Sequence, residues 1–316
     1  MSLVVAVVGP TATGKSDLGL ALARELGGEV VNADALQLYR GMDVGTAKLA
    51  PAERGGVPHH LLDELDPGED ASVAWYRERA RSVLGVLAAR GGRAVVVGGS
   101  GLYVRALLDR LEFPGTDPQV RAELEDRVQR EGPGVLHDEL ARLDPVAAVA
   151  IDRRNTRRVV RALEVHRLTG RPSTGDLPRY VYEIPAVQIG LDLDRAVLDR
   201  AIEARVDRMW ADGLVEEVRA LAARGLSRTA ARAVGYAQVL AMVRGELDEA
   251  GARAATVAGT RRLARKQMGW FGRDPRVHWL DAADPHLLDR ALAVVGRADQ
   301  GVLVERVEAT RRVLGS

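Results

Sequence analysis

The 316-residue sequence contains no cysteine, few aromatic residues and no long apolar run. Without cysteine, the chain cannot form disulfides, use a thiolate nucleophile, or bind zinc or an iron–sulfur cluster through thiolates. Its longest apolar runs, near 3–8 and 94–97, are far shorter than the ~20 residues of a membrane-spanning helix, so we expect no membrane partner. The formal net charge is only +1, and any nucleic acid must therefore be held by local basic patches. No basic stretch precedes the first apolar run, which predicts a cytoplasmic protein.

The composition, with 47% hydrophobic and 28% charged residues, is typical of a globular protein with a core of alanine, valine and leucine. Short apolar runs predict buried strands near 3–8, 29–32, 93–97, 186–191 and 277–280. After Asp194, helical spacing places several apolar residues on one face: Leu198, Ala201, Ile202, Val206, Met209 and Trp210. Strands that alternate with helices predict an α/β fold with a parallel sheet, in which ligands bind at the carboxyl ends of the strands.

Residues 9–16 match the pattern G-x-x-x-x-G-K-[ST] between a predicted strand and a predicted helix. These eight residues are Gly9, Pro10, Thr11, Ala12, Thr13, Gly14, Lys15 and Ser16. The glycines let successive backbone N–H groups surround a phosphate, Lys15 neutralises phosphate oxygens, and the Ser16 hydroxyl can reach Mg²⁺. We therefore expect a P-loop that binds a phosphate or a diphosphate.

A cluster of turn-forming residues at 114–118 is followed, to about Tyr180, by charged sequence with helical spacing and few strand signals. This change predicts a P-loop core with a parallel sheet flanked by helices, formed by 1–115 and 181–316, and a smaller helical insertion at 116–180. Two further amphipathic stretches are expected between 285 and 314. We expect the chain to act as a monomer.

Hydrolases with a P-loop usually place a magnesium-binding aspartate after another buried strand. The strand at 93–97 is instead followed by Gly98-Gly99-Ser100-Gly101, and the acid is Asp34, just past the second predicted strand. Asp34 can organise Mg²⁺, accept a proton from a nucleophile, or simply cap the following turn. Ser100 can offer its hydroxyl to developing negative charge or merely form a turn.

Basic residues cluster in two helical stretches. In the first, Arg154, Arg157, Arg158 and Arg161 share one predicted face. This face suits a phosphate backbone, but it equally suits a solvated surface with ion pairs. The second, at 261–267, suits either phosphate or nucleic acid, or alternatively the cover of a core helix by its aliphatic stems.

The residues alone therefore predict an enzyme that acts on a phosphorylated compound, with a polyanionic partner as a further possibility. A P-loop small-molecule kinase that binds ATP and uses Asp34 to activate a hydroxyl fits them equally.

In order along the chain, the motifs resemble those of the tRNA dimethylallyltransferases, also called tRNA isopentenyltransferases. Besides the P-loop, the matching blocks are DALQLYR at 34–40, GTAK at 45–48, PHHL at 58–61, GGSGLY at 98–103, RALEV at 161–165, GLVEEV at 213–218, GY at 235–236, RKQ at 265–267 and WF at 270–271. A P-loop is shared by many enzymes, whereas this whole series is specific to one family and spans most of the chain.

The resemblance implies transfer of a dimethylallyl group from dimethylallyl diphosphate to N6 of the adenosine 3′ to the anticodon in tRNA, with release of diphosphate and help from Mg²⁺. It implies that Asp34 is the general base, that Ser100 assists by hydrogen bonding, that residues 9–16 bind the diphosphate, and that Ser16 binds the metal. Contacts with the tRNA anticodon stem-loop are implied for Asp34, Ala35, Leu36, Gln37, Ser100, Arg121, Arg157, Arg158, Val159, Val160 and Arg161. The adenine would have to be flipped out of its stack to reach the donor.

The sequence departs from the family pattern at several positions. Ala35 replaces a usual Ser, Ser100 replaces Thr, and Gly269 and Gly272 replace Thr and Arg beside Trp270. Arg265-Lys266 also reverses the usual Lys-Arg order. We expect the reaction to be kept and the local geometry around Trp270 to differ. The kinase remains an alternative, and ATP turnover would reveal it. A nucleotide-gated RNA-binding protein is a further alternative, and its function would survive Asp34→Ala.

Overall fold

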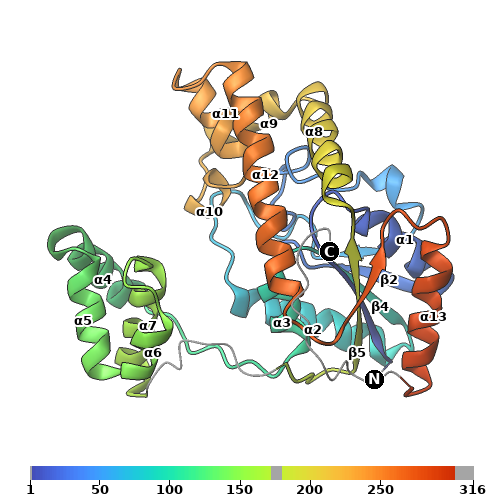
Figure 1. Cartoon of the computed structure of the whole chain (residues 1–316), viewed down its shortest axis with the longest axis horizontal. Helices are drawn as coiled ribbons and strands as arrows, with labels where there is room; N and C mark the ends of the chain where they lie inside the picture. Colours follow the sequence, from blue (N-terminus) through green and yellow to red (C-terminus); the bar gives the residue numbers. More distant parts are fainter. Residues whose placement is uncertain (1, 172–179, 303–316) are drawn as a thin grey trace. The chain divides into compact units, whose positions relative to one another are not determined.

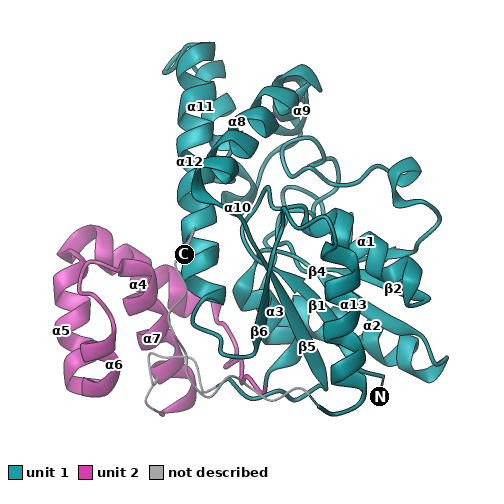
Figure 2. Cartoon of the chain, turned by 45° about the vertical axis from the view of Figure 1, so that its right-hand side comes forward, with its two compact units in different colours: residues 1–109, 180–316 teal, residues 110–179 magenta. Residues whose placement is uncertain are grey.

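The computed structural model describes residues 2–171 and 180–302, which belong to two compact units (Figure 2). The larger unit comprises Met1–Asp109 and Tyr180–Ser316, and the smaller unit comprises Arg110–Arg179. The smaller unit falls on the segment expected to form a helical insertion, 116–180, and begins slightly before it.

The larger unit is built on a six-stranded sheet in which each strand runs parallel to its neighbours. The strand order is β3-β2-β4-β1-β5-β6. Figure 1 labels β2, β4 and β5 of this sheet. The strands are β1 (Val4–Val8), β2 (Gly28–Asn32), β3 (His59–His60), β4 (Arg93–Val97), β5 (Ala186–Asp192) and β6 (Val277–Asp281). Five of them confirm the predicted strands, while β3 is too short to produce a periodic pattern.

The carboxyl ends of β1, β2 and β4 lie at one edge of the sheet. Val97 is in register with both Val7 of β1 and Asn32 of β2, so the segments after these three strands meet there. Ala33 N donates to Val97 O at 2.8 Å. A β-carbon at Gly98 would lie 2.3 Å from the Ala33 carbonyl oxygen, so only glycine permits this close approach. In parallel sheets this edge is where ligands bind.

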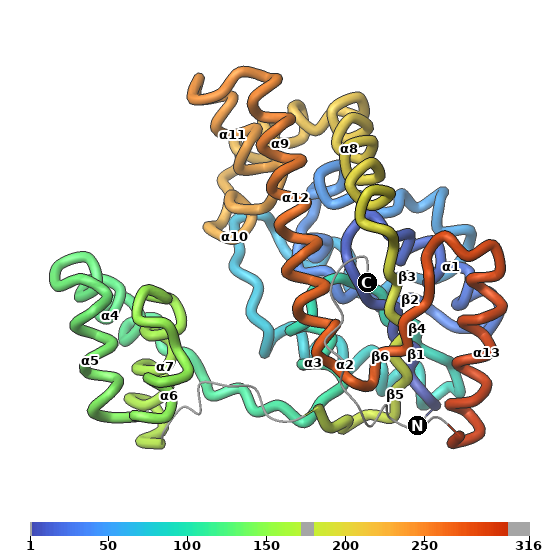
Figure 3. Tube along the Cα trace, viewed as in Figure 1, coloured from blue at the N-terminus to red at the C-terminus, as the bar shows by residue number. Residues whose placement is uncertain are grey.

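Helices cover both faces of the sheet, as the predicted α/β fold requires (Figure 3). On one face α1 (Lys15–Glu25) and α13 (Leu287–Asp299) pack against Val5 and Val7. On the other face α2 (Val73–Ala89) and α3 (Gly101–Leu108) pack in the cluster that contains the alternate residues Val4, Ala6 and Val8. Because β1 is buried on both faces, it reads as a continuous apolar run.

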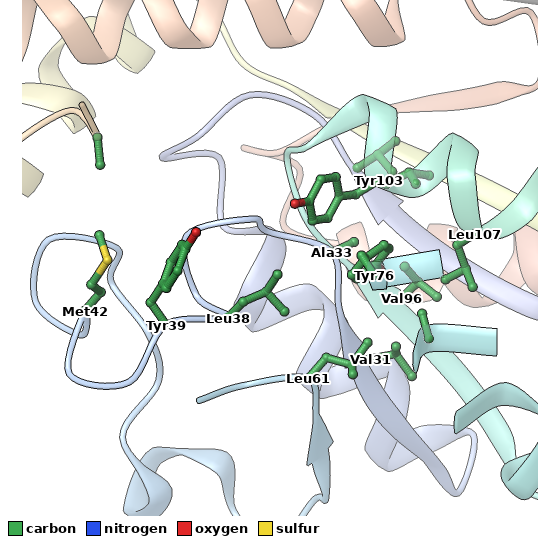
Figure 4. Close-up of a cluster of buried hydrophobic side chains, with 14 of the residues drawn as sticks. Val31, Ala33, Leu38, Tyr39, Met42, Leu61, Tyr76, Val96, Tyr103 and Leu107 are labelled. Carbon is green, nitrogen blue, oxygen red and sulfur yellow. The ribbon is translucent and has the colours of Figure 1, made fainter. Parts of the chain in front are cut away.

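The segment after β2 is held by buried apolar side chains (Figure 4). Leu38, Tyr39 and Met42 are fully buried in the same cluster as Tyr76. The Tyr76 hydroxyl donates to the carbonyl of Asn32 at 2.9 Å, where β2 ends. This packing fixes the loop that carries Asp34.

A second group of helices follows β5. Its members are α8 (Arg195–Ala211), α9 (Leu214–Arg224), α10 (Arg228–Ala231), α11 (Tyr236–Val243) and α12 (Glu249–Phe271). The carboxylate of Asp194 caps α8, and the apolar face predicted for this helix is buried except for the partly buried Ala201. α8 and α12 pack together through Leu198, Ile202 and Ala264.

The chain continues through β6 into α13, the first of the two expected C-terminal amphipathic stretches. The second stretch, which reaches 314, lies outside the described residues. Within 2–171 and 180–302, no helix has the length and apolar character needed to cross a membrane.

A buried network of charges lies where α3 ends. Arg276 donates to Asp109 Oδ1 and to Asp274 Oδ2, both at 2.7 Å, and the side chains of all three are at most 4% exposed. The guanidinium carbon of Arg276 also lies 3.9 Å from the centre of the Tyr182 ring. Such desolvated charges are stable only while they remain paired.

The described part of the smaller unit contains the helices α4 (Pro118–Glu131), α5 (Pro133–Leu143), α6 (Pro145–Ala150) and α7 (Thr156–Thr169). The side chains of Asp117, Asp144 and Asn155 accept hydrogen bonds from backbone N–H groups at the starts of α4, α6 and α7. Leu124, Leu136, Leu140 and Leu163 are completely buried and give this unit its own core.

Candidate active site

The predicted P-loop connects β1 to α1 and leaves a set of backbone amides open to a ligand. Gly14, immediately before α1, has φ 79° and supplies no side-chain cap, while Ala12 also has a positive φ, 64°. A β-carbon at Gly9 would lie 2.6 Å from the carbonyl oxygen of Leu191, so glycine is required there too. The loop is braced from within, since Thr13 Oγ1 donates to Pro10 O at 2.8 Å. Uncapped amides at a helix N-terminus favour an anion.

Two cations face the cleft beside this loop. Burial and the nearby charge of Arg205 lower the pKa of Lys15 to about 7, while Asp34 opposes the change. Burial likewise lowers the pKa of Arg205, again opposed by Asp34. Among residues 2–171 and 180–302, no carboxylate oxygen lies within 4.0 Å of the Lys15 ammonium or the Arg205 guanidinium. Both side chains are half-buried, and their hydrogen-bond partners are carbonyls, Pro10 O for Lys15 and Thr46 O for Arg205. Two such cations attract an anionic group.

Asp34 occupies the turn after β2 and lines the same cleft. Its N–H donates to Asn32 Oδ1 at 2.8 Å, and its Oδ1 accepts from the N–H of Leu36 at 3.0 Å. The carboxylate therefore caps the turn, as the structural interpretation predicts. That bond uses one oxygen, which leaves the carboxylate with further acceptor capacity for the cleft.

Ser100 lies next to Asp34 and contacts the backbone of its turn. The Ser100 hydroxyl accepts from the N–H of Ala35 at 3.2 Å. It follows Gly99, which lines the cleft, and stands immediately before α3. The observed bond shows that Ser100 helps to hold the turn that carries Asp34.

Gln267 of α12 joins two walls of the cleft, and sequence reasoning gave it no individual role. Its Oε1 accepts from Thr11 N at 2.8 Å, and its Nε2 donates to Gly99 O at 3.1 Å. A β-carbon at Gly99 would lie 2.2 Å from that Nε2, which explains a glycine at this position. In the same basic run, Arg261 pairs with Glu203 of α8 at 2.6 Å, so this part of the run packs the helices together.

The cleft is wide and is lined by both polar and apolar residues. Its volume, including open solvent, is about 820 Å³. Its polar lining residues include Thr11, Lys15, Ser16, Asp34, Gln37 and Arg205. Its lining from α8, α12 and the segment before α11 includes Met209, Val234, Thr256, Thr260 and Leu263. The hydroxyls of Thr256 and Thr260 donate to carbonyls one turn earlier in their own helix, so these two residues add little polar surface to the cleft.

Two family descriptions match this chain: "IPP transferase" over residues 37–274 and "Isopentenyl transferase" over residues 2–68. The tRNA dimethylallyltransferase of Streptomyces coelicolor is 60% identical over 301 residues, which cover 93% of this chain and 96% of that protein. The corresponding enzyme of Streptomyces avermitilis is 59% identical over 288 residues, or 90% of this chain and 92% of that protein. The chain belongs to the tRNA dimethylallyltransferase family.

Solved structures of this family have the same fold. The tRNA isopentenylpyrophosphate transferase of Bacillus halodurans matches with a TM-score of 0.71 at 37% identity, covering 95% of this chain and 98% of that one. A eukaryotic dimethylallyltransferase acting on tRNA matches with a TM-score of 0.84 over 97% of this chain and 82% of that one, and at 22% identity the likeness concerns the fold alone. Membership of the tRNA dimethylallyltransferase family does not favour the alternative of a small-molecule kinase.

The arginines that the family resemblance assigns to tRNA lie in the smaller unit, in unequal environments. Arg157 and Arg158 are exposed on α7, and Arg121 on α4 pairs with Glu164 at 2.8 Å while staying 43% exposed. Arg161 instead donates to the carbonyls of Pro114 and Gly115, at 2.5 and 3.0 Å, and to Glu164 at 2.8 Å. Much of its hydrogen-bonding capacity is thus used inside the unit.

Two predictions for this region need correction. Val159 and Val160 are 0% and 4% exposed in the core of the smaller unit, so their side chains do not form a surface for RNA. Arg154 precedes α7, which begins at Thr156, and pairs with Asp152 at 3.3 Å. It is therefore not part of the helical face assumed from sequence spacing.

The departures beside Trp270 leave that side chain packed in the larger unit. Trp270 lies against Gly101 at the start of α3, where a β-carbon would come within 1.8 Å of the indole. At Gly269 a β-carbon would meet no other atom within 4 Å, so the missing side chain leaves open space. Gly272 ends α12 in a right-handed conformation, φ −66°, that does not require glycine.

Arg205 is the site residue that sequence reasoning missed. It lies on α8 between Ile202 and Met209, both part of the predicted apolar face. A charged residue within a buried helical stripe is an available signal, because burial of an isolated charge is costly unless something compensates it.

Proposed function

We propose that this chain transfers a dimethylallyl group from dimethylallyl diphosphate to N6 of the adenosine 3′-adjacent to the anticodon in tRNA, releasing diphosphate. The observation that carries the proposal is the arrangement of one cleft. P-loop amides, Lys15 and Arg205 face a site suited to a polyanion, Asp34 lines the same cleft, and apolar residues line it as well. Family membership supports this pair of substrates for such a cleft.

In this reaction the bond between C1 of the donor and its diphosphate oxygen breaks, and a bond from C1 to N6 of adenine forms. The electron pair of the broken bond leaves with the diphosphate. Lys15, Arg205 and the loop amides stabilise the charge that develops on the diphosphate. Such stabilisation by fixed cations and dipoles is usually the largest single contribution to catalysis. The Asp34 carboxylate accepts the proton lost by N6.

The oxygen atoms of Ser16 and Asp34 in the cleft suit Mg²⁺. This ion usually keeps several waters and binds one or two protein oxygens together with substrate phosphates. Ser16 and Asp34 both line the cleft, whereas the described residues contain no cluster of three or more acidic, histidine or cysteine side chains. We expect Ser16 to hold the ion against the diphosphate, where it would add positive charge to the leaving group.

The tRNA must present a base that is stacked or paired in the free molecule. Flipping the adenine into the cleft would bring N6 to Asp34, as enzymes that modify bases generally require. The exposed arginines of the smaller unit, Arg121, Arg157 and Arg158, are suited to the phosphates of the anticodon stem. The substrates support action in the cytoplasm, and since one chain lines the whole cleft, we propose that a monomer suffices.

The experiment supplies unmodified tRNA, Mg²⁺ and radiolabelled dimethylallyl diphosphate to the purified protein and locates the label after nuclease digestion. Label on N6 of the adenosine beside the anticodon is expected, and ATP in a parallel reaction should not be consumed. Asp34→Asn should keep tRNA binding but lower turnover by about 10²–10⁴-fold, the usual contribution of a general base. The exposed Asp212→Asn is the matched control. Equal turnover in wild type and Asp34→Asn would exclude the assigned role.

A further inference from the structure

The loop 43–48 contributes residues to the cleft, and three consecutive backbone N–H groups of the loop donate to one carboxylate. Its far end is held separately by Lys48, which pairs with Asp43 and Asp63. The backbone N–H groups of Asp43, Val44 and Gly45 donate to Glu217 at 3.0, 2.7 and 3.1 Å. Consecutive amides that converge in this way form a concave site for an anion. Here the anion is a side chain of the first turn of α9.

Tyr236, the first residue of α11, completes the surroundings of this carboxylate. Its hydroxyl donates to Glu217 Oε1 at 2.5 Å, and the residue is fully buried. Burial and the adjacent Glu217 raise the pKa of Tyr236 well above its ordinary value, so the hydroxyl stays a donor. The ring also limits the loop, because a β-carbon at Gly45 would lie 2.4 Å from the ring atom Cε2.

One carbonyl connects this loop to the cation of the cleft. Thr46 O accepts from Arg205 Nη2 and from Gln37 Nε2, each at 3.2 Å. The Thr46 hydroxyl donates to Met42 O at 2.6 Å, which fixes the residue from the other side. A shift of the loop would therefore move the acceptor that orients the guanidinium of Arg205.

We propose that Glu217 is a positioning residue for the prenyl donor. By fixing 43–45 it places the Thr46 carbonyl, and through it the Arg205 guanidinium, where the diphosphate binds. Glu217 itself is occupied by three amides and one hydroxyl and need not touch the substrate. The inference rests on the proposed function for the identity of the donor, while its physical content is affinity for a diphosphate group.

A double-mutant cycle tests this coupling by calorimetric binding of inorganic pyrophosphate in the presence of Mg²⁺. Glu217→Ala should weaken binding about tenfold in the wild-type background and have almost no further effect in Arg205→Ala, because both changes remove the same contact. Glu216→Gln, an exposed neighbour in the same turn, is the control. Additive losses in the double variant would show that Glu217 does not act through Arg205.

If Glu217→Ala does not fold, Glu217→Gln and Tyr236→Phe take its place in the same double-mutant cycle, because both keep the shape of the cluster. The glutamine offers one carbonyl oxygen and sets an NH₂ group against backbone donors, so we expect a smaller loss of the same kind. An unchanged Kd for pyrophosphate in both variants, at an unchanged Tm, would overturn the inference.

Kinetics distinguish this inference from the proposed function. In an active enzyme, Glu217→Gln should raise KM for dimethylallyl diphosphate and leave kcat and KM for tRNA within about twofold. A rise in KM for tRNA alone would contradict the positioning role. A wild-type protein that binds pyrophosphate with the predicted coupling but does not prenylate tRNA would refute the proposed function and leave the role of Glu217 intact.

Discussion

The affinity for the diphosphate donor should depend on pH, because the surroundings of Lys15 change the pKa of its ammonium group. Burial and the charge of Arg205 lower the pKa of this ammonium from 10.5 to about 7. In the free protein it is therefore about half protonated at neutral pH. A diphosphate bound against the nitrogen stabilises the charged form and raises that pKa, so binding takes up a proton. Affinity is highest below the free-protein pKa and falls as the pH rises through it.

If the bound form stays protonated, the dissociation constant rises by a factor of about two at pH 7 and about ten at pH 8, relative to acidic solution. Calorimetry with inorganic pyrophosphate in buffers of different ionisation enthalpy should show uptake of about half a proton at pH 7 and about nine-tenths at pH 8. Lys15→Arg is the control, because the guanidinium stays charged and the titration of pyrophosphate is common to both proteins. An identical pH dependence in wild type and Lys15→Arg would refute the reasoning.

Two further changes test contacts that brace the larger unit. Gln267→Ala removes the bonds to Thr11 and Gly99, so we expect a loss of about 1–3 kcal/mol in the free energy of unfolding, measured in urea, together with weaker pyrophosphate binding. A variant with unchanged stability and binding would show that Gln267 is dispensable. Arg276→Met removes the guanidinium that pairs with two buried carboxylates, leaving Asp109 paired with Arg105 and Asp274 bonded to the neutral amide of Gln188, and should cost about 3–5 kcal/mol in the same assay. A loss below about 1 kcal/mol would mean that Arg105 and Gln188 suffice to stabilise these carboxylates.

Local features of this fold could be predicted from the sequence because neighbouring residues determine them. The P-loop, the strand before it and the helix after it depend on a continuous segment whose glycines and apolar residues have fixed spacing. The position of Asp34 near the loop also followed, since the carboxyl ends of parallel strands share one edge. By contrast, β3 is only two residues long, and its pairing with β2 depends on the fold around it.

The least predictable feature was which arginine would face a ligand, because pairing is decided by tertiary contacts. Arg161 and Arg205 both lie on helices beside buried residues, and their local sequences do not distinguish them. In the structure, Glu164 and two carbonyls bind Arg161 within the smaller unit. Arg205 donates a hydrogen bond to one carbonyl, that of Thr46, and lines the same cleft as Lys15. Desolvation without a matching carboxylate is costly for the free protein, and an incoming diphosphate removes that cost. We therefore expect these two half-buried cations of the cleft, and not Arg161, to bind the diphosphate of the donor.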